Sequence, residues 1–115
     1  MSSVVVRSAD RARIAQAVQA YVARLRAEHP EVLRVIWFGS WVRGEATPGS
    51  DVDLCIIVAR SDKPRWARAA DFLPVGFPVG IDLFVYTPEE FERLRTEAPG
   101  WYAAIQAGWE VKGDE

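Results

Sequence analysis

Three short apolar runs constrain the fold of this 115-residue chain most strongly. They extend from Val32 to Phe38, from Asp51 to Val58 and from Val79 to Tyr86. Short apolar runs bounded by polar or turn-forming residues predict buried strands. We therefore expect a sheet of three strands, or of four if Trp109 to Val111 adds a short edge strand.

Helical patterns precede and separate these runs. From Ser8 to Glu28, apolar residues at helical spacing make one stripe, which consists of Ile14, Val18, Tyr21, Val22 and Leu25. The arginines of this segment lie mostly off the stripe and predict a solvated helix face; they are Arg11, Arg13, Arg24 and Arg26. A second helix is expected from Pro64 to Leu73, with an apolar side formed by Trp66, Ala69, Ala70 and Leu73.

A capping box marks the start of a further helix. Thr87 is the expected N-cap, Pro88 suits the first helical position, and Glu90 completes the box. This helix ends before Pro99, and a short helix from Trp101 to Ala107 follows. The order of elements predicts one α/β (α+β) domain over residues 1–115, in which helices pack on a small mixed sheet.

Composition and charge exclude several classes of function. Half of the residues are hydrophobic, which is enough for one core without disulfides or structural metals. The net charge of -2 argues against a protein that holds nucleic acid by bulk electrostatics. Cys55 is the single cysteine and His29 the single histidine, so neither an internal disulfide nor a histidine-based triad is expected. No apolar stretch is long enough to span a membrane, and a soluble cytoplasmic protein is the expectation.

Three acidic residues occupy positions inside or next to the apolar runs. Asp51 and Asp53 lie two residues apart at the start of a strand, so their side chains point to the same face. Asp82 interrupts the third run and completes a cluster if that strand lies beside the second. Carboxylates are the ligands that Mg²⁺ prefers. Three of them could hold two ions about 3.5–4 Å apart, as in enzymes that displace a phosphoryl group.

Gly39 and Ser40 follow the first strand directly and predict a phosphate-binding turn. A glycine at such a turn lets backbone N–H groups approach a ligand closely, and the serine hydroxyl adds a donor. Neither motif alone is specific evidence for function, because a Gly-Ser pair is usually only a turn and a D-x-D pair is usually a loop or cap feature. Ten residues, Trp41 to Ser50, separate Ser40 from Asp51. The joint pattern G-S-x10-D-x-D should match by chance in roughly one chain in a thousand of this length.

The stretch from Phe38 to Leu54, F-G-S-W-V-R-G-E-A-T-P-G-S-D-V-D-L, resembles the signature of the minimal nucleotidyltransferases of the DNA polymerase β superfamily. Ile81-Asp82-Leu83 resembles the strand that carries the third acid of that family. The resemblance implies that Asp51, Asp53 and Asp82 ligate Mg²⁺ and that Asp82 acts as base towards the acceptor hydroxyl.

The same resemblance assigns the nucleotide site. Gly39 and Ser40 would bind the triphosphate, and Arg43 would contact a phosphate or a partner, or form a structural ion pair. Trp41 departs from the polar residue that is common at its position. All of the acidic residues of the motif are present.

The resemblance also implies a partner. Many minimal nucleotidyltransferases are antitoxins paired with a helical HEPN-domain toxin, and the better-understood of these antitoxins use ATP to transfer AMP to a tyrosine of that toxin. Two alternatives stay open: an antitoxin that acts by binding alone, and an enzyme that modifies a small molecule of the aminoglycoside kind. The C-terminal aromatic residues Trp101, Tyr102 and Trp109 either pack a terminal helix on the sheet or form a patch for a partner or for self-association.

Overall fold

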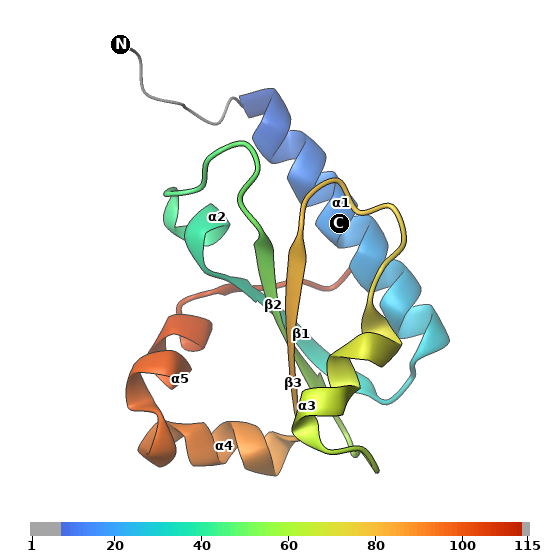
Figure 1. Ribbon diagram of the computed structural model, residues 1–115, viewed down its shortest axis with the longest axis vertical. Helices are drawn as coiled ribbons and strands as arrows, with labels where there is room; N and C mark the ends of the chain where they lie inside the picture. The colour runs from blue at the N-terminus through green and yellow to red at the C-terminus, as the bar shows by residue number, and fades with distance from the viewer. Residues whose placement is uncertain (1–7, 114–115) are drawn as a thin grey trace.

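The computed structural model describes residues 8–113, and Figure 1 shows helices on both sides of a central sheet. The helices are α1 (Ser8–Glu28), α2 (Ser40–Arg43), α3 (Arg65–Arg68), the 3₁₀ helix η1 (Ala69–Phe72), α4 (Pro88–Glu97) and α5 (Pro99–Gln106). The strands are β1 (Val32–Phe38), β2 (Val52–Val58), β3 (Ile81–Tyr86) and β4 (Trp109–Glu110).

The sheet is mixed and has the strand order β3-β2-β1-β4. β1 is antiparallel to both of its neighbours, β2 and β4. β2 and β3 are parallel, so the chain must cross from one end of the sheet to the other between them. Residues 59–80 make this crossover and include α3 and η1. The expected α/β fold with a fourth, short strand is confirmed.

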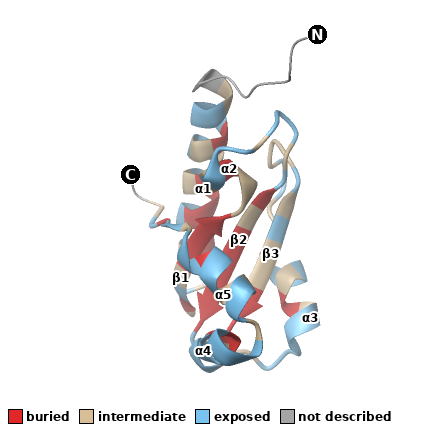
Figure 2. Cartoon of the chain, turned by 90° about the vertical axis from the view of Figure 1, so that its left-hand side faces the viewer, coloured by how far each residue is buried: buried red, intermediate tan, exposed pale blue. Residues whose placement is uncertain are grey.

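Two layers of apolar side chains cover the sheet, one on each face, and Figure 2 shows the buried strands between the helices. The layer under α1 contains all five residues of its predicted stripe, each at most 4% exposed. The other layer lies under α4 and α5 and includes Phe91, Leu94 and Ile105. Cys55 is fully buried in this second layer, as predicted.

The capping box at the start of α4 is confirmed. The hydroxyl of Thr87 accepts a hydrogen bond from the backbone N–H of Glu90 at 3.3 Å. In return the backbone N–H of Thr87 donates to the Glu90 carboxylate at 2.8 Å. These bonds satisfy two donors that a helix start otherwise leaves without partners.

The predicted helix from Pro64 to Leu73 is only partly right. The segment forms one turn of α-helix, α3, and then tightens into η1. The expected apolar side is wrong, because Trp66 is 87% exposed and Leu73 is 56% exposed. The buried residues are Arg68 and Phe72. Arg68 turns inward because its guanidinium finds charged and carbonyl partners there, which apolar periodicity does not reveal.

The C-terminal aromatic residues mostly pack on the domain. Trp101 and Tyr102 are partly buried against the layer under α4 and α5. Trp109 stays 53% exposed and packs its ring edge-on against the buried Trp37 at 5.8 Å. No helix in residues 8–113 is long and apolar enough to cross a membrane.

Candidate active site

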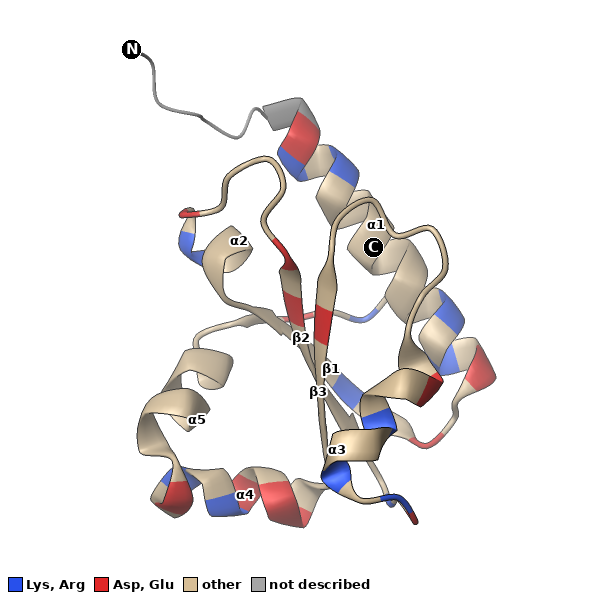
Figure 3. Ribbon diagram, in the orientation of Figure 1, with Lys and Arg blue, Asp and Glu red and all other residues tan. Residues whose placement is uncertain are grey.

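The side chains of Asp53 and Asp82 occupy neighbouring positions at one end of the sheet. The parallel register of β2 and β3 pairs the two residues, and Asp53 is paired with Phe38 across the other edge of β2. Figure 3 shows acidic residues on adjacent stretches of β2 and β3. Adjacent strands lie about 4.8 Å apart. Both carboxylates project to the face under α4 and α5, because Cys55 and Phe84, two residues further along each strand, pack there.

Asp51 reaches the same region from the loop that precedes β2. The backbone N–H of Val52 donates to the carbonyl of Gly80 at 2.9 Å, which holds the start of β2 against the segment that leads into β3. A Cβ added to Gly80 would lie 2.2 Å from the Asp51 carboxylate. Gly80 therefore leaves the space that Asp51 occupies. Sequence reasoning missed this glycine, because its role depends on a contact between two strands.

Gly39 makes a similar space for Asp53. It has φ 89° and ψ -154° at the turn between β1 and α2, a left-handed backbone that favours glycine. A Cβ on Gly39 would lie 2.2 Å from Oδ2 of Asp53. The predicted phosphate-binding turn therefore contacts one of the predicted metal ligands directly.

Like charges and partial burial act on Asp53. Its pKa is raised to about 6, first by desolvation, then by the negative charges of Asp82 and Asp51 and by a hydrogen bond with Asp82. The positive charge of Arg43 opposes the rise. An acid with a raised pKa and a specific charged neighbour is typical of a functional site. Asp53 therefore interacts with both of the other predicted carboxylates.

Arg43 is exposed at the end of α2 and forms an ion pair with Glu45 at 2.9 Å. Both side chains are more than half exposed, so the pair contributes little to stability. The charge of Arg43 still acts on Asp53. The structural ion pair is therefore present, and a phosphate contact by Arg43 stays a prediction.

Trp41 anchors the loop between α2 and β2. The indole is 4% exposed, and its Nε1 donates to the carbonyl of Ser50 at 2.9 Å. The backbone N–H of Thr47 donates to the Ser50 hydroxyl at 2.8 Å within the same loop. Since Ser50 precedes Asp51, Trp41 fixes the segment that carries the first acid. A tryptophan in place of a polar residue thus has a structural reason.

The carboxylates of the candidate site suit Mg²⁺, which needs only a few protein ligands. Within residues 8–113, no group of three or more His, Cys, Asp or Glu side chains converges closely enough to hold a metal ion. Mg²⁺ usually binds one or two carboxylates and takes its other ligands from water and substrate phosphates. The paired Asp53 and Asp82, with Asp51 beside them, match that requirement. A site for two ions stays a prediction.

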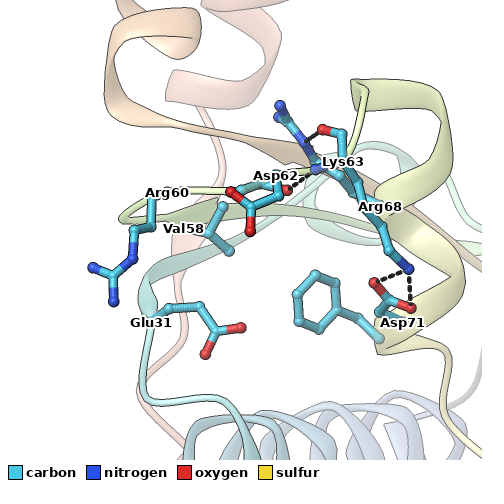
Figure 4. Close-up of a pocket in the computed structure, with 9 residues that line it drawn as sticks. Glu31, Val58, Arg60, Asp62, Lys63, Arg68 and Asp71 are labelled. Carbon is cyan, nitrogen blue, oxygen red and sulfur yellow. Dashed lines mark hydrogen bonds and ion pairs between the residues drawn. The ribbon is translucent and has the colours of Figure 1, made fainter.

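A surface cavity of about 340 Å³ lies at the other end of β2 (Figure 4). Its lining includes Val58, the last residue of β2, together with Arg60 and Phe72. The ammonium of Lys63 and the carboxylate of Asp71 face each other there at 2.8 Å. The three acids of the candidate site lie at the opposite end of the strands. The cavity is therefore separate from them.

Comparison with known proteins shows which family a segment of this chain resembles. Residues 18–73 match the family described as nucleotidyltransferase domain. The matched segment contains Gly39, Ser40, Asp51 and Asp53 and ends before Asp82. No curated protein sequence matches the chain significantly.

A crystal structure of a protein from Sulfolobus solfataricus, described there as a proposed nucleotidyltransferase, has a similar fold. The TM-score is 0.60 at 21% sequence identity, over 74% of this chain and 77% of that one. At this identity the likeness concerns the fold alone. The family match over residues 18–73 supports nucleotide transfer in general, and the solved structure adds a shared fold.

Gly39→Ala is expected to damage the site locally. The new Cβ would overlap the Asp53 carboxylate and would also strain a left-handed backbone, at a cost of about 1–3 kcal/mol. Chemical denaturation should measure this loss, and the transfer rate should fall with it. Gly44→Ala is a matched control, because Gly44 also has positive φ but has no atom near its Cβ position. Equal effects of both variants would show that Gly39 matters only for its backbone.

Proposed function

We propose that this protein is a Mg²⁺-dependent nucleotidyltransferase that moves AMP from ATP to a hydroxyl group of a partner protein. The observation that carries the proposal is the pairing of Asp53 with Asp82 on parallel strands, beside the turn at Gly39. Gly39 and Asp53 lie within the matched family segment, and Asp82 follows that segment in the chain. The acceptor would be a tyrosine of a HEPN-domain toxin, with this chain as the antitoxin.

The roles of the residues follow from their positions. Gly39 and Ser40 would bind the β- and γ-phosphates through backbone N–H groups and the serine hydroxyl. Asp51 and Asp53 would hold Mg²⁺, and Asp82 would share in a second ion. When bound, such ions neutralise phosphate charge and stabilise the attacking and leaving oxygens. The pKa of Asp53 is raised first by desolvation and then by the charges of Asp82 and Asp51, and a bound cation would favour the ionised carboxylate.

In this proposal Asp82 accepts the proton of the acceptor. It lies on β3, the edge strand of the sheet, and is exposed to an incoming acceptor. In the proposed step the acceptor oxygen forms a bond to the α-phosphorus while the bond from that phosphorus to the oxygen of the β-phosphate breaks. Pyrophosphate leaves with the electron pair, and the proton of the acceptor hydroxyl moves to a carboxylate oxygen of Asp82.

The open position of the acids favours a macromolecular acceptor. Asp51 and Asp82 are exposed, and the 340 Å³ cavity lies at the far end of the sheet. Small-molecule sites usually bury most of their ligand. A partner protein that covers this surface would supply both the acceptor and the exclusion of water.

The test uses the product of the neighbouring gene, co-purified with this chain and incubated with ATP and Mg²⁺. Mass spectrometry should detect the addition of AMP to the partner and locate it on a tyrosine. Toxin neutralisation by a stable complex without any mass change would favour the alternative of binding alone. Modification of an aminoglycoside, and not of the partner, would favour the small-molecule alternative.

A further inference from the structure

An aromatic cluster borders the paired carboxylates on the same face of the sheet. The indole of Trp101, from α5, lies 5.4 Å from the ring of Phe38 and 4.9 Å from the ring of Phe84, both edge-on. Phe38 and Phe84 are 5.8 Å apart. Trp101 therefore bridges β1 and β3 across the central strand.

The register places this cluster next to the acids. Phe38 is in the same row as Asp53 and Asp82, because the strands pair these three residues. Phe84 is in the next row on this face, two residues along β3 from Asp82. A step of two residues along a strand is about 6.6 Å. An aromatic ligand group could thus contact the cluster while its phosphates stay near the carboxylates.

The indole of Trp101 is held in one orientation and stays partly accessible. Its Nε1 donates to the hydroxyl of Tyr86 at 2.9 Å. Its side chain is only partly buried, unlike Phe38, which is 4% exposed. A fixed ring with an accessible part loses little conformational entropy when another ring stacks on it.

Gly39 connects the cluster to the predicted phosphate site. It directly follows Phe38 in the chain and contacts Asp53. Phosphates bound at this turn and a ring at Trp101 would therefore flank the carboxylates. Asp82, on the edge strand β3, stays open to the acceptor from the outer side of the sheet.

We infer that Trp101, supported by Phe38 and Phe84, forms the subsite that binds the base of the nucleoside triphosphate. The inference rests on the proposed function and specifies the substrate class further. Stacking on an aromatic ring tolerates any base, because every base has a π-face. Recognition would then depend on the presence of a base more than on its identity.

The test compares two probes in the presence of Mg²⁺: α,β-methylene ATP, which cannot transfer its nucleotide, and inorganic tripolyphosphate, which has no base. Calorimetry on Trp101→Ala should show α,β-methylene ATP binding weakened by about tenfold or more, with tripolyphosphate binding unchanged. Trp101→Phe, which keeps a ring in the cluster, should restore most of the affinity. Trp109→Ala is the matched control, because Trp109 is 53% exposed and packs on Trp37, in the opposite layer.

Each other outcome contradicts the inference in a recognisable way. Equal weakening of both probes by Trp101→Ala would show general damage to the site. Unchanged binding of both probes, with a raised KM for the protein acceptor, would assign Trp101 to the acceptor. If the wild type transfers AMP and Trp101→Ala binds both probes normally, the assignment of Trp101 to the base subsite is wrong and the proposed function stands. If the wild type binds neither probe, the proposed function fails as well.

Discussion

Asp53→Asn is expected to lower the rate of the proposed AMP transfer by about 10³-fold or more, which corresponds to about 4 kcal/mol of lost transition-state stabilisation. Asparagine has nearly the same shape but no negative charge, so the space beside Gly39 stays filled. The loss would therefore report the charge of Asp53 and not its volume. Initial rates of label incorporation at saturating Mg²⁺ measure the effect.

The same variant should remain folded and be at least as stable as the wild type in metal-free buffer at neutral pH. Removal of one carboxylate relieves its repulsion from Asp51 and Asp82. Asp62→Asn is the matched control, because Asp62 is an exposed aspartate at the other end of β2. Full transfer activity in Asp53→Asn, or an equal loss in Asp62→Asn, would contradict the assignment.

Arg68→Met is expected to destabilise the domain by about 3 kcal/mol or more, because it leaves a mostly buried carboxylate without its partner. The guanidinium of Arg68 donates to Glu90 at 2.6 Å and 3.1 Å and to the carbonyls of Lys63 and Val85 at 3.0 Å and 3.2 Å. Only 7% of its side chain is exposed. This network joins α3 to β3 and α4, and urea denaturation measures its contribution.

Lys63→Met is the control for this variant. Lys63 forms an ion pair with Asp71, but both side chains are about half exposed. Such surface pairs contribute about 0–1 kcal/mol. A similar loss of unfolding free energy in the two variants would show that burial does not strengthen the ion pair of Arg68.

At acid pH the wild type should lose its greater folding stability relative to Arg68→Met. Hydrogen bonds from Arg68, followed by those from Thr87, lower the pKa of Glu90 from 4.5 to about 2. A lowered carboxylate pKa stabilises the folded state above about pH 4.5, and this stabilisation is lost as the pH falls towards 2. The difference in unfolding free energy between the two proteins should therefore shrink over this interval. A constant difference would contradict the ion pair as its source.

Local patterns predicted those elements whose signals lie within one segment of the chain. The stripe from Ile14 to Leu25 and the capping box at Thr87 are such signals, and both are confirmed. Strand positions were also predicted, because buried strands need apolar runs. The proximity of Asp82 to Asp53 was only a conditional expectation, since strand order is not encoded in either strand alone.

Features that depend on contacts between distant segments were missed. The burial of Arg68 was not predicted, because its partner Glu90 lies in a different helix. Gly80 had no signal of its own, and its role follows from the Asp51 carboxylate against it. Trp101 could be recognised as aromatic, but its position beside the acids depends on how α5 packs on Phe38 and Phe84.

The most direct test of the central claim compares ATP labelled on the α-phosphate with ATP labelled on the γ-phosphate. Both are incubated with Mg²⁺, this protein and the product of the neighbouring gene. Nucleotidyl transfer by the site at Asp51, Asp53 and Asp82 predicts that the partner acquires the α-label alone and that Asp53→Asn abolishes this transfer. Transfer of the γ-label, or α-label transfer that persists in Asp53→Asn, would contradict the account.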